Sequence, residues 1–278
     1  MNHFLVSVKQ VPDTTNIRID PETGSLIRKG VPAILNPYDA HAVAAAAEWK
    51  RKLGGKLTVI TMGPSAAEEA LQECVEMGAD RGVLISDRKF AGSDTLATSY
   101  VLAEAIRKIH QEEPLDLIFF GKQAIDGDTA QVGPGAAVRL NMPLITYAVD
   151  IREINTEEGF ALIERKTESG REVIKTRLPA VLTCEKSIAE IPHASLPDLI
   201  ASLKYQPESW SAEEPVAYDV TQVGLKGSPT WVANSGTPET REPAETIPVD
   251  EVGAAEAVSQ ALEKILSGDG LIGKGEGS

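Results

Sequence analysis

The sequence predicts an α/β fold with a parallel-core twisted sheet, flanking helices, an antiparallel meander and an extended C-terminal arm. Three observations indicate this class. Strand patterns alternate with helical patterns over roughly the first 140 residues, as in a parallel sheet with right-handed crossovers. Polar and apolar residues then alternate around two short turns between Thr146 and Arg177. From about Ser187 onward, prolines are frequent and regular patterns are scarce.

The first part of the chain supplies the elements of the parallel core. Apolar runs of strand length are each followed by a turn and a helical pattern. The expected strands are His3–Lys9, Lys56–Met62, Gly82–Ser86 and Leu115–Phe120. The expected helices begin at Asn36, at Ser65, at Asp94-Thr95 and at either Asp128 or Thr129. A hairpin of Asn16–Asp20 and Leu26–Lys29, joined by Pro21–Gly24, follows the first strand.

Polar residues mark the expected helix starts. Asn36 precedes Pro37 and is expected to cap a helix that ends at Leu53. Ser65 and Glu68 stand at the spacing of a capping box.

The second part of the chain is expected to leave the parallel pattern. The meander is followed by Ala180–Cys184, which can return to the sheet, and by a short helix at Pro197–Lys204. A last helix is expected at Asp250–Leu266. We therefore divide the chain into an α/β domain, residues 1–186, and an arm, residues 187–278, that packs on something else.

The composition excludes several kinds of partner. The chain has 278 residues and a net charge of −14, which repels nucleic acid and anionic membranes. The four histidines have no His or Cys partner at metal-ligand spacing, so no metal site is expected. Cys74 and Cys184 lie in apolar runs and are expected to be buried free thiols. Neither a signal peptide nor a membrane span is expected, which favours the cytoplasm.

The stretch Leu115–Pro134 is the main functional candidate. Its apolar run stops at Gly121, and a polar turn leads into a helix. Free backbone N–H groups at such a helix start bind phosphates at the strand ends of open α/β sheets. Neither GxGxxG nor GxxxxGK[ST] is present, and Asp126 and Asp128 are expected to support the turn or to bind a ribose hydroxyl. From these residues, both a nucleotide site and a capped turn without a ligand stay open.

Five motifs resemble one protein family in their order and spacing. They are Lys9–Asp13, Asn36–Asp39, Thr61–Pro64, Met77–Asp80 and Gly121–Gly133. The pattern is similar to the β subunit of electron transfer flavoprotein, most closely over residues 1–205. The resemblance implies a heterodimer with an α subunit, on which the arm packs. Simple members of this family hold AMP in the site and electron-bifurcating members hold FAD. Ser86–Thr98 resembles the bifurcating type, which favours FAD.

The resemblance also implies which residues contact the ligand and the partners. Those expected at the cofactor are Ser7, Asn36, Pro37, Tyr38, Asp39, Met62, Asp94, Thr95, Thr98, Gln123, Ala124, Ile125, Asp126, Gly127, Asp128, Thr129, Ala130, Gln131, Val132, Gly133 and Pro134. The stretch Pro192–Pro197 resembles the loop that docks on acyl-CoA dehydrogenases, with Leu196 and Pro197 at the docking position.

The function implied is flavin-based electron bifurcation. NADH would be the donor, ferredoxin or flavodoxin the low-potential acceptor, and an acyl-CoA-type dehydrogenase would exchange electrons with the α-subunit FAD. One alternative is a simple electron carrier with structural AMP in the same site. Another is an adenine-nucleotide-binding regulatory protein of the universal-stress type, which the long arm disfavours.

Overall fold

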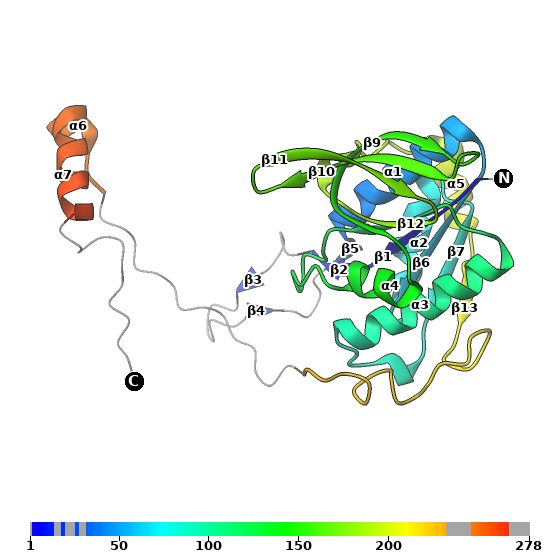
Figure 1. Cartoon of the computed structure of the whole chain (residues 1–278). Helices are drawn as coiled ribbons and strands as arrows, with labels where there is room; N and C mark the ends of the chain where they lie inside the picture. The colour runs from blue at the N-terminus through cyan, green and yellow to red at the C-terminus, as the bar shows by residue number, and fades with distance from the viewer. Residues whose placement is uncertain (1, 14–17, 20–25, 28–31, 232–245, 267–278) are drawn as a thin grey trace. The chain divides into compact units, whose positions relative to one another are not determined.

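A mostly parallel sheet forms the core of the chain in this computed structural model (Figure 1). The structure describes residues 2–13, 18–19, 26–27, 32–231 and 246–266. These residues form a nine-stranded sheet with the order β11-β10-β9-β12-β8-β1-β6-β7-β13. The predicted fold class is confirmed, because a parallel core, flanking helices and an antiparallel extension are all present.

The parallel strands occupy the centre and one edge of the sheet. They are β1 (His3–Val8), β6 (Lys56–Met62), β7 (Arg81–Ile85), β8 (Leu117–Gly121), β12 (Ala180–Cys184) and β13 (Glu208–Trp210). Strand β12 returns between β8 and β9 and pairs in parallel with both, as its apolar pattern predicted. Every residue of β1 is buried, because helices cover both faces of the sheet.

The predicted meander forms the other edge of the sheet. Its strands are β9 (Leu144–Asn155), β10 (Phe160–Thr167) and β11 (Gly170–Arg177), paired antiparallel in this order. Two small ladders lie apart from this sheet. Strand β2 (Gln10–Pro12) pairs with β5 (Ala33–Leu35), and β3 (Arg18–Ile19) with β4 (Leu26–Ile27). The predicted hairpin is therefore present, and its turn lies outside the described residues.

Helices pack on both faces of the sheet. They are α1 (Pro37–Leu53), α2 (Glu68–Glu76), α3 (Thr95–Glu112) and α4 (Val132–Leu140). Helices α1 and α2 share one hydrophobic cluster with Phe4 and Val6 of β1. Helices α3 and α4 share the other with Leu5, since successive side chains of a strand point to opposite faces. Three 3₁₀ turns, Ser65–Ala67, Arg88–Phe90 and Lys186–Ile188, complete this part.

The order in which successive strands join the sheet changes side between β7 and β8. From β1 it moves to β6 and β7, and α3 then carries it back to β8 on the other side of β1. Ligands of open α/β sheets bind outside the carboxyl ends of the strands at such a switch point. The fold therefore predicts a ligand site at the carboxyl ends of β1 and β8.

Two predicted helix starts were wrong in detail. Helix α4 begins at Val132, with Gln131 rather than Asp128 or Thr129 at the N-cap position. The capping box of Ser65 and Glu68 is absent, because Ser65 begins a 3₁₀ turn and α2 starts only at Glu68 without a side-chain cap. Asn36 does precede α1, but its side chain makes no capping hydrogen bond.

The C-terminal third contains more packed structure than its sequence pattern indicated. The chain divides into two compact units, Met1–Ser235 and Gly236–Ser278, whereas we expected a boundary at 186/187. Helix α5 (Leu196–Lys204) and β13 belong to the first unit, in which Trp210 and Tyr218 are buried in the core. In the second unit, Gly253 separates α6 (Val249–Val252) from α7 (Ala254–Leu266), where one continuous helix was expected.

The predicted state of the two cysteines is confirmed. Cys74 and Cys184 are free and buried. Nowhere in the described ranges does a cluster of three His, Cys, Asp or Glu side chains suit a metal ion. None of the helices that the structure describes has the length and apolar character needed to span a membrane.

Candidate functional site

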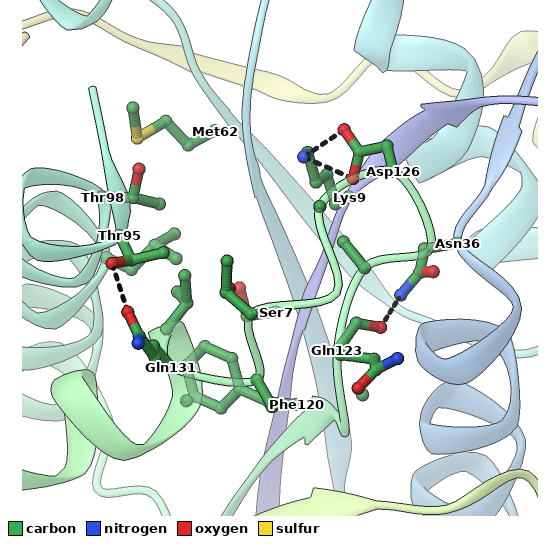
Figure 2. A pocket seen from close by; sticks show the side chains of 18 of the residues that line it. Ser7, Lys9, Asn36, Met62, Thr95, Thr98, Phe120, Gln123, Asp126 and Gln131 are labelled. Atoms are coloured by element: carbon green, nitrogen blue, oxygen red, sulfur yellow. Dashed lines mark hydrogen bonds and ion pairs between the residues drawn. The ribbon is translucent and has the colours of Figure 1, made fainter. Parts of the chain in front are cut away.

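A cavity of about 650 Å³ lies at the carboxyl ends of the parallel strands. Ser7 of β1 and Phe120 of β8, which are register partners, lie between its two sides (Figure 2). On one side is the loop after β8, Gln123–Asp128, which we call the loop wall. On the other is Phe90–Thr98 at the start of α3, which we call the helix wall. The cavity thus occupies the switch point between β1 and β8.

Asn36 holds the loop wall in place. Its Nδ2 donates to the carbonyl oxygen of Gln123 at 2.9 Å, and its Oδ1 accepts from the amide of Ile125 at 3.2 Å. The side chain is buried, and both ends of its amide are satisfied by one loop. Figure 2 shows the bond to Gln123. Asn36 therefore joins the start of α1 to the loop wall, because these bonds use the oxygen that a helix cap would need.

Asp39 joins the ends of β1 and β8. Its Oδ2 accepts from the amide of Lys9 at 2.8 Å, and its Oδ1 accepts from the amide of Gly121 at 2.9 Å. A Cβ on Gly121 would lie 2.2 Å from Oδ1, so this position requires glycine. Burial raises the pKa of Asp39 to about 7, although both amide bonds favour the ionised form. The carboxyl group acts as a clasp between the two strand ends.

Asp126 and Asp128 support the loop wall, as the sequence suggested. Asp126 accepts from Lys9 Nζ at 2.6 and 2.8 Å, which links the loops after β1 and β8 (Figure 2). Asp128 Oδ1 accepts from Gln123 Nε2 at 2.6 Å across the turn. Asp128 itself has a φ of 50°, a left-handed conformation that Asp tolerates better than most residues. Both carboxylates are therefore engaged by the protein.

The helix wall is held by Asp94. Its Oδ1 accepts from the amides of Leu96 and Ala97 at 2.9 and 3.0 Å and caps α3, whose start at Asp94-Thr95 was predicted. Thr95 Oγ1 donates to Gln131 Oε1 at 2.8 Å and so links this wall to the start of α4 (Figure 2). The side chains of Phe90, Met62 and Leu102 give this part of the cavity an apolar lining.

Most of the site residues expected from the sequence line this cavity. They are Ser7, Asn36, Asp39, Met62, Asp94, Thr95, Thr98, Gln123, Ala124, Asp126, Gly127, Asp128, Thr129, Ala130, Gln131, Val132 and Gly133. Four expected residues are not part of the lining. Pro37 opens α1, Ile125 is held by Asn36, Pro134 lies in the first turn of α4, and the Tyr38 ring centroid lies 5.8 Å from Lys122 Nζ.

The structure adds lining residues that the sequence analysis did not single out. They are Val8, Lys9, Phe90, Gly92, Ser93, Leu102, Phe120, Gly121, Lys122 and Thr230. Lys9 carried a usable signal, because it opens the motif Lys9–Asp13 at the end of the first strand. Thr230 meets the helix wall from 136 residues further along the chain, a contact that no local pattern indicates.

The start of α4 is built to approach a ligand closely. Its first amides have no acceptor within the helix, and the helix dipole places positive charge there. Gly133 packs on the strand ends, since a Cβ would lie 2.8 Å from Thr183 Cγ2 and 3.2 Å from Phe120 Cβ. The walls thus offer backbone N–H groups for a phosphate, side-chain amides and hydroxyls for a sugar, and apolar side chains for a flat ring. These residues fit a nucleotide or a flavin nucleotide.

Fold and cavity together define an open, doubly wound α/β-sheet protein with its ligand crevice at the switch point. Comparison with known proteins narrows this class. Residues 23–214 match the family model "Electron transfer flavoprotein domain". Because the match covers more than half of the chain, the protein belongs to the electron transfer flavoprotein family, and its function is electron transport.

Relatives over nearly the full length assign the chain to the β-subunit type. It is 44% identical over 266 residues to protein FixA of Azotobacter vinelandii, covering 95% of each chain. It is 41% identical over 265 residues to electron transfer flavoprotein subunit beta of Thermoanaerobacterium thermosaccharolyticum, covering 95% of this chain and 98% of that one. It is 44% identical over 265 residues to the caffeyl-CoA reductase-Etf complex subunit CarD of Acetobacterium woodii, covering 94% and 98%. The universal-stress alternative is thereby excluded.

Proposed function

We propose that this β subunit binds FAD in the cavity and takes part in flavin-based electron bifurcation with its α subunit. NADH is the proposed donor, and ferredoxin or flavodoxin the low-potential acceptor. The α-subunit FAD exchanges the other electron with an acyl-CoA-type dehydrogenase. The name of the CarD relative, which refers to a caffeyl-CoA reductase complex, supports a dehydrogenase of this chemistry.

The observation that carries the FAD assignment is the presence of two walls. The loop wall and the start of α4 suffice for the phosphate and sugar of a mononucleotide such as AMP. The cavity nevertheless extends to the helix wall, where Phe90, Met62 and Leu102 add apolar surface and Thr95 and Thr98 add hydroxyl groups. A flat, mainly apolar ring system with polar edges matches this second part.

The residues of the chain have separate proposed roles toward that cofactor. The first amides of α4, at Val132 and Gly133, hold a phosphate with the help of the helix dipole. Asn36 and Asp39 keep the loop wall and the strand ends in register. Thr95 and Thr98 face the ring and supply hydrogen bonds. When bound, the isoalloxazine supplies hydride and single-electron transfer, and the protein supplies its position and electrostatic environment.

The proposed docking site for the dehydrogenase is the exposed side of α5. Ser202 is the buried residue of this helix and donates to Glu76 Oε1 of α2 at 3.0 Å. Leu196 and Leu203 are 69% and 70% exposed. An apolar stripe that faces outward fits a hydrophobic pocket on a partner protein. Cytoplasmic location remains a prediction from the sequence.

The test is a flavin count in the purified heterodimer. The chain is co-produced with its α subunit, and the cofactors are released and quantified by chromatography. Two FAD per heterodimer, together with NADH-dependent reduction of the bound flavin, are the expected result. One FAD together with one AMP would refute the FAD assignment and support the simple-carrier alternative.

A further inference from the structure

A turn far along the chain, Gly224–Thr230, packs against the helix wall of the cavity. The amide of Asp94 donates to Ser228 Oγ at 2.8 Å. The second carboxylate oxygen of Asp94 accepts from the Thr230 amide at 3.1 Å and from Thr230 Oγ1 at 2.8 Å.

Asp94 is thus shared between two parts of the molecule. Its Oδ1 caps α3 through the amides of Leu96 and Ala97, and its Oδ2 is occupied by Thr230. A carboxylate with four donors is held in one orientation, because hydrogen bonds to a charged acceptor are the strong ones. The turn therefore determines how the cap of α3 is oriented.

A second set of contacts holds the same turn at Ser93, one residue before Asp94. The amide of Gly224 donates to Ser93 Oγ at 3.0 Å, and Ser228 Oγ donates to the Gly224 carbonyl at 2.7 Å. Gly224 has a φ of +60°, and a Cβ there would lie 2.2 Å from the carbonyl oxygen of Lys89. The close approach needs glycine, so the turn and the helix wall fit each other at backbone level.

The contacts reach the cavity directly. Ser93, Asp94, Thr95, Thr98 and Thr230 all line it. We propose that Ser228 and Thr230 are positioning residues for the cofactor site. They fix Asp94, and through it the first turn of α3, so that Thr95 and Thr98 face the ring of the bound cofactor. The identity of the cofactor rests on the proposed function. The effect of the turn on the first turn of α3 does not.

The test compares single variants of the full chain co-produced with the α subunit. Thr230→Val removes the hydroxyl and keeps the shape and the backbone amide, and Thr230→Ser restores the hydroxyl. Thr221→Val is the matched control, because Thr221 bonds only to exposed Asp219 in the same segment. Two quantities are measured: hydrogen–deuterium exchange of the amides in residues 90–100 without added nucleotide, and the visible spectrum and reduction potential of bound flavin.

Thr230→Val is expected to speed exchange of the Leu96 and Ala97 amides about tenfold, as the loss of one hydrogen bond to a charged group implies. It is also expected to shift the spectrum and potential of the second flavin. Thr230→Ser returns both to the unaltered values, and Thr221→Val leaves both unchanged. Unchanged exchange in Thr230→Val overturns the proposal, whatever nucleotide is bound. Faster exchange with an unchanged flavin also overturns it.

The flavin count of the unaltered protein is read separately. If that protein holds AMP and a single flavin, the FAD assignment fails. The positioning role is then decided by AMP retention measured alongside exchange. Faster exchange with weaker AMP retention in Thr230→Val supports it, and AMP retention equal to that of Thr221→Val overturns it.

Discussion

The carboxylates around the cavity mostly face the protein rather than the ligand. Asp39 accepts from two backbone amides, Asp126 from Lys9, Asp128 from Gln123, and Asp94 from the start of α3 and Thr230. Each of these negative charges is matched by hydrogen-bond donors of the chain itself. A strongly acidic protein can therefore keep a site for an anionic ligand, since the first amides of α4 are not used by these carboxylates.

Asp128 allows a direct test of how the loop wall is held. Replacement by Ala removes the acceptor for Gln123 Nε2 and places Ala in the left-handed conformation, so we expect a stability loss of about 1–2 kcal/mol. Nucleotide affinity should fall about tenfold, because the first amides of α4 follow this turn. Asp128→Asn is the control, because it keeps an acceptor and tolerates the conformation. Calorimetric titration and urea unfolding measure both effects, and equal affinities in the two variants would contradict this role.

Asp39 leads to a prediction about pH. Its folded-state pKa, raised to about 7, lies above the unfolded value, so the folded protein binds this proton more tightly. The contribution of Asp39 to the free energy of unfolding is therefore greatest at acidic pH. It falls as the pH rises from about 4 to about 7, and it is constant above that range.

The measurement is urea unfolding at a series of pH values in the unaltered protein and in Asp39→Asn. The difference between the two proteins isolates this group, because other titrating residues contribute equally to both. We expect the difference to change between about pH 4 and 7 and to level off at higher pH. A difference that does not depend on pH would show that Asp39 keeps an ordinary pKa in the folded protein.

At the scale of elements, the strands were easier to predict than the helix starts. The buried strands are continuous apolar runs, and this pattern does not depend on which elements they contact. Capping residues depend on competition between local and distant partners. Asn36 has the right neighbours for a cap, yet its side chain bonds to Gln123 and Ile125, almost ninety residues away. Sequence alone cannot rank these alternatives, since both satisfy the same amide group.

The part of the site that strand ends and loop motifs form could be predicted from the sequence. Ser7 and Met62 lie at the carboxyl ends of parallel strands and the loop wall follows another, so they had to meet at one edge. The clasp made by Asp39 and the turn that contains Thr230 were not predictable. Both depend on contacts across the fold, and strand β13, which brings the later segment to the sheet, has only three residues. So short an element leaves no periodic pattern to detect.

Helix α5 exposes most of its apolar side chains, and this gives the docking prediction. Leu196→Ala should lower the rate of electron transfer to the dehydrogenase at limiting protein concentration about tenfold, through a higher KM. Flavin content and thermal stability should stay unchanged, because Leu196 is exposed. Val173→Ala is the control, since Val173 is also exposed but lies on β11. An equal KM for Leu196→Ala and the control would place docking elsewhere.

At the scale of the whole molecule, the two units differ in how much of their apolar surface is buried within the chain. The first unit buries large side chains on both faces of the sheet. In the second unit, α7 carries Val258, Leu262 and Ile265 on one face, each about half exposed within the chain. Isolated helices of this length are marginal in water, so we propose that this stripe packs on another subunit. The β-subunit assignment supplies the candidate, which is the α subunit.

A chain that ends at Ser235 tests this arrangement. The sheet and the cavity should stay folded, with a melting temperature within a few degrees of the full chain, because the contacts of the first unit are internal. Co-purification with the α subunit should fall steeply. A full-length variant with Val258, Leu262 and Ile265 all replaced by Ser should lose the α subunit to a similar degree, since it removes the stripe and keeps the chain length. Should both variants retain the α subunit as well as the unaltered chain, the heterodimer is held by the α/β unit alone.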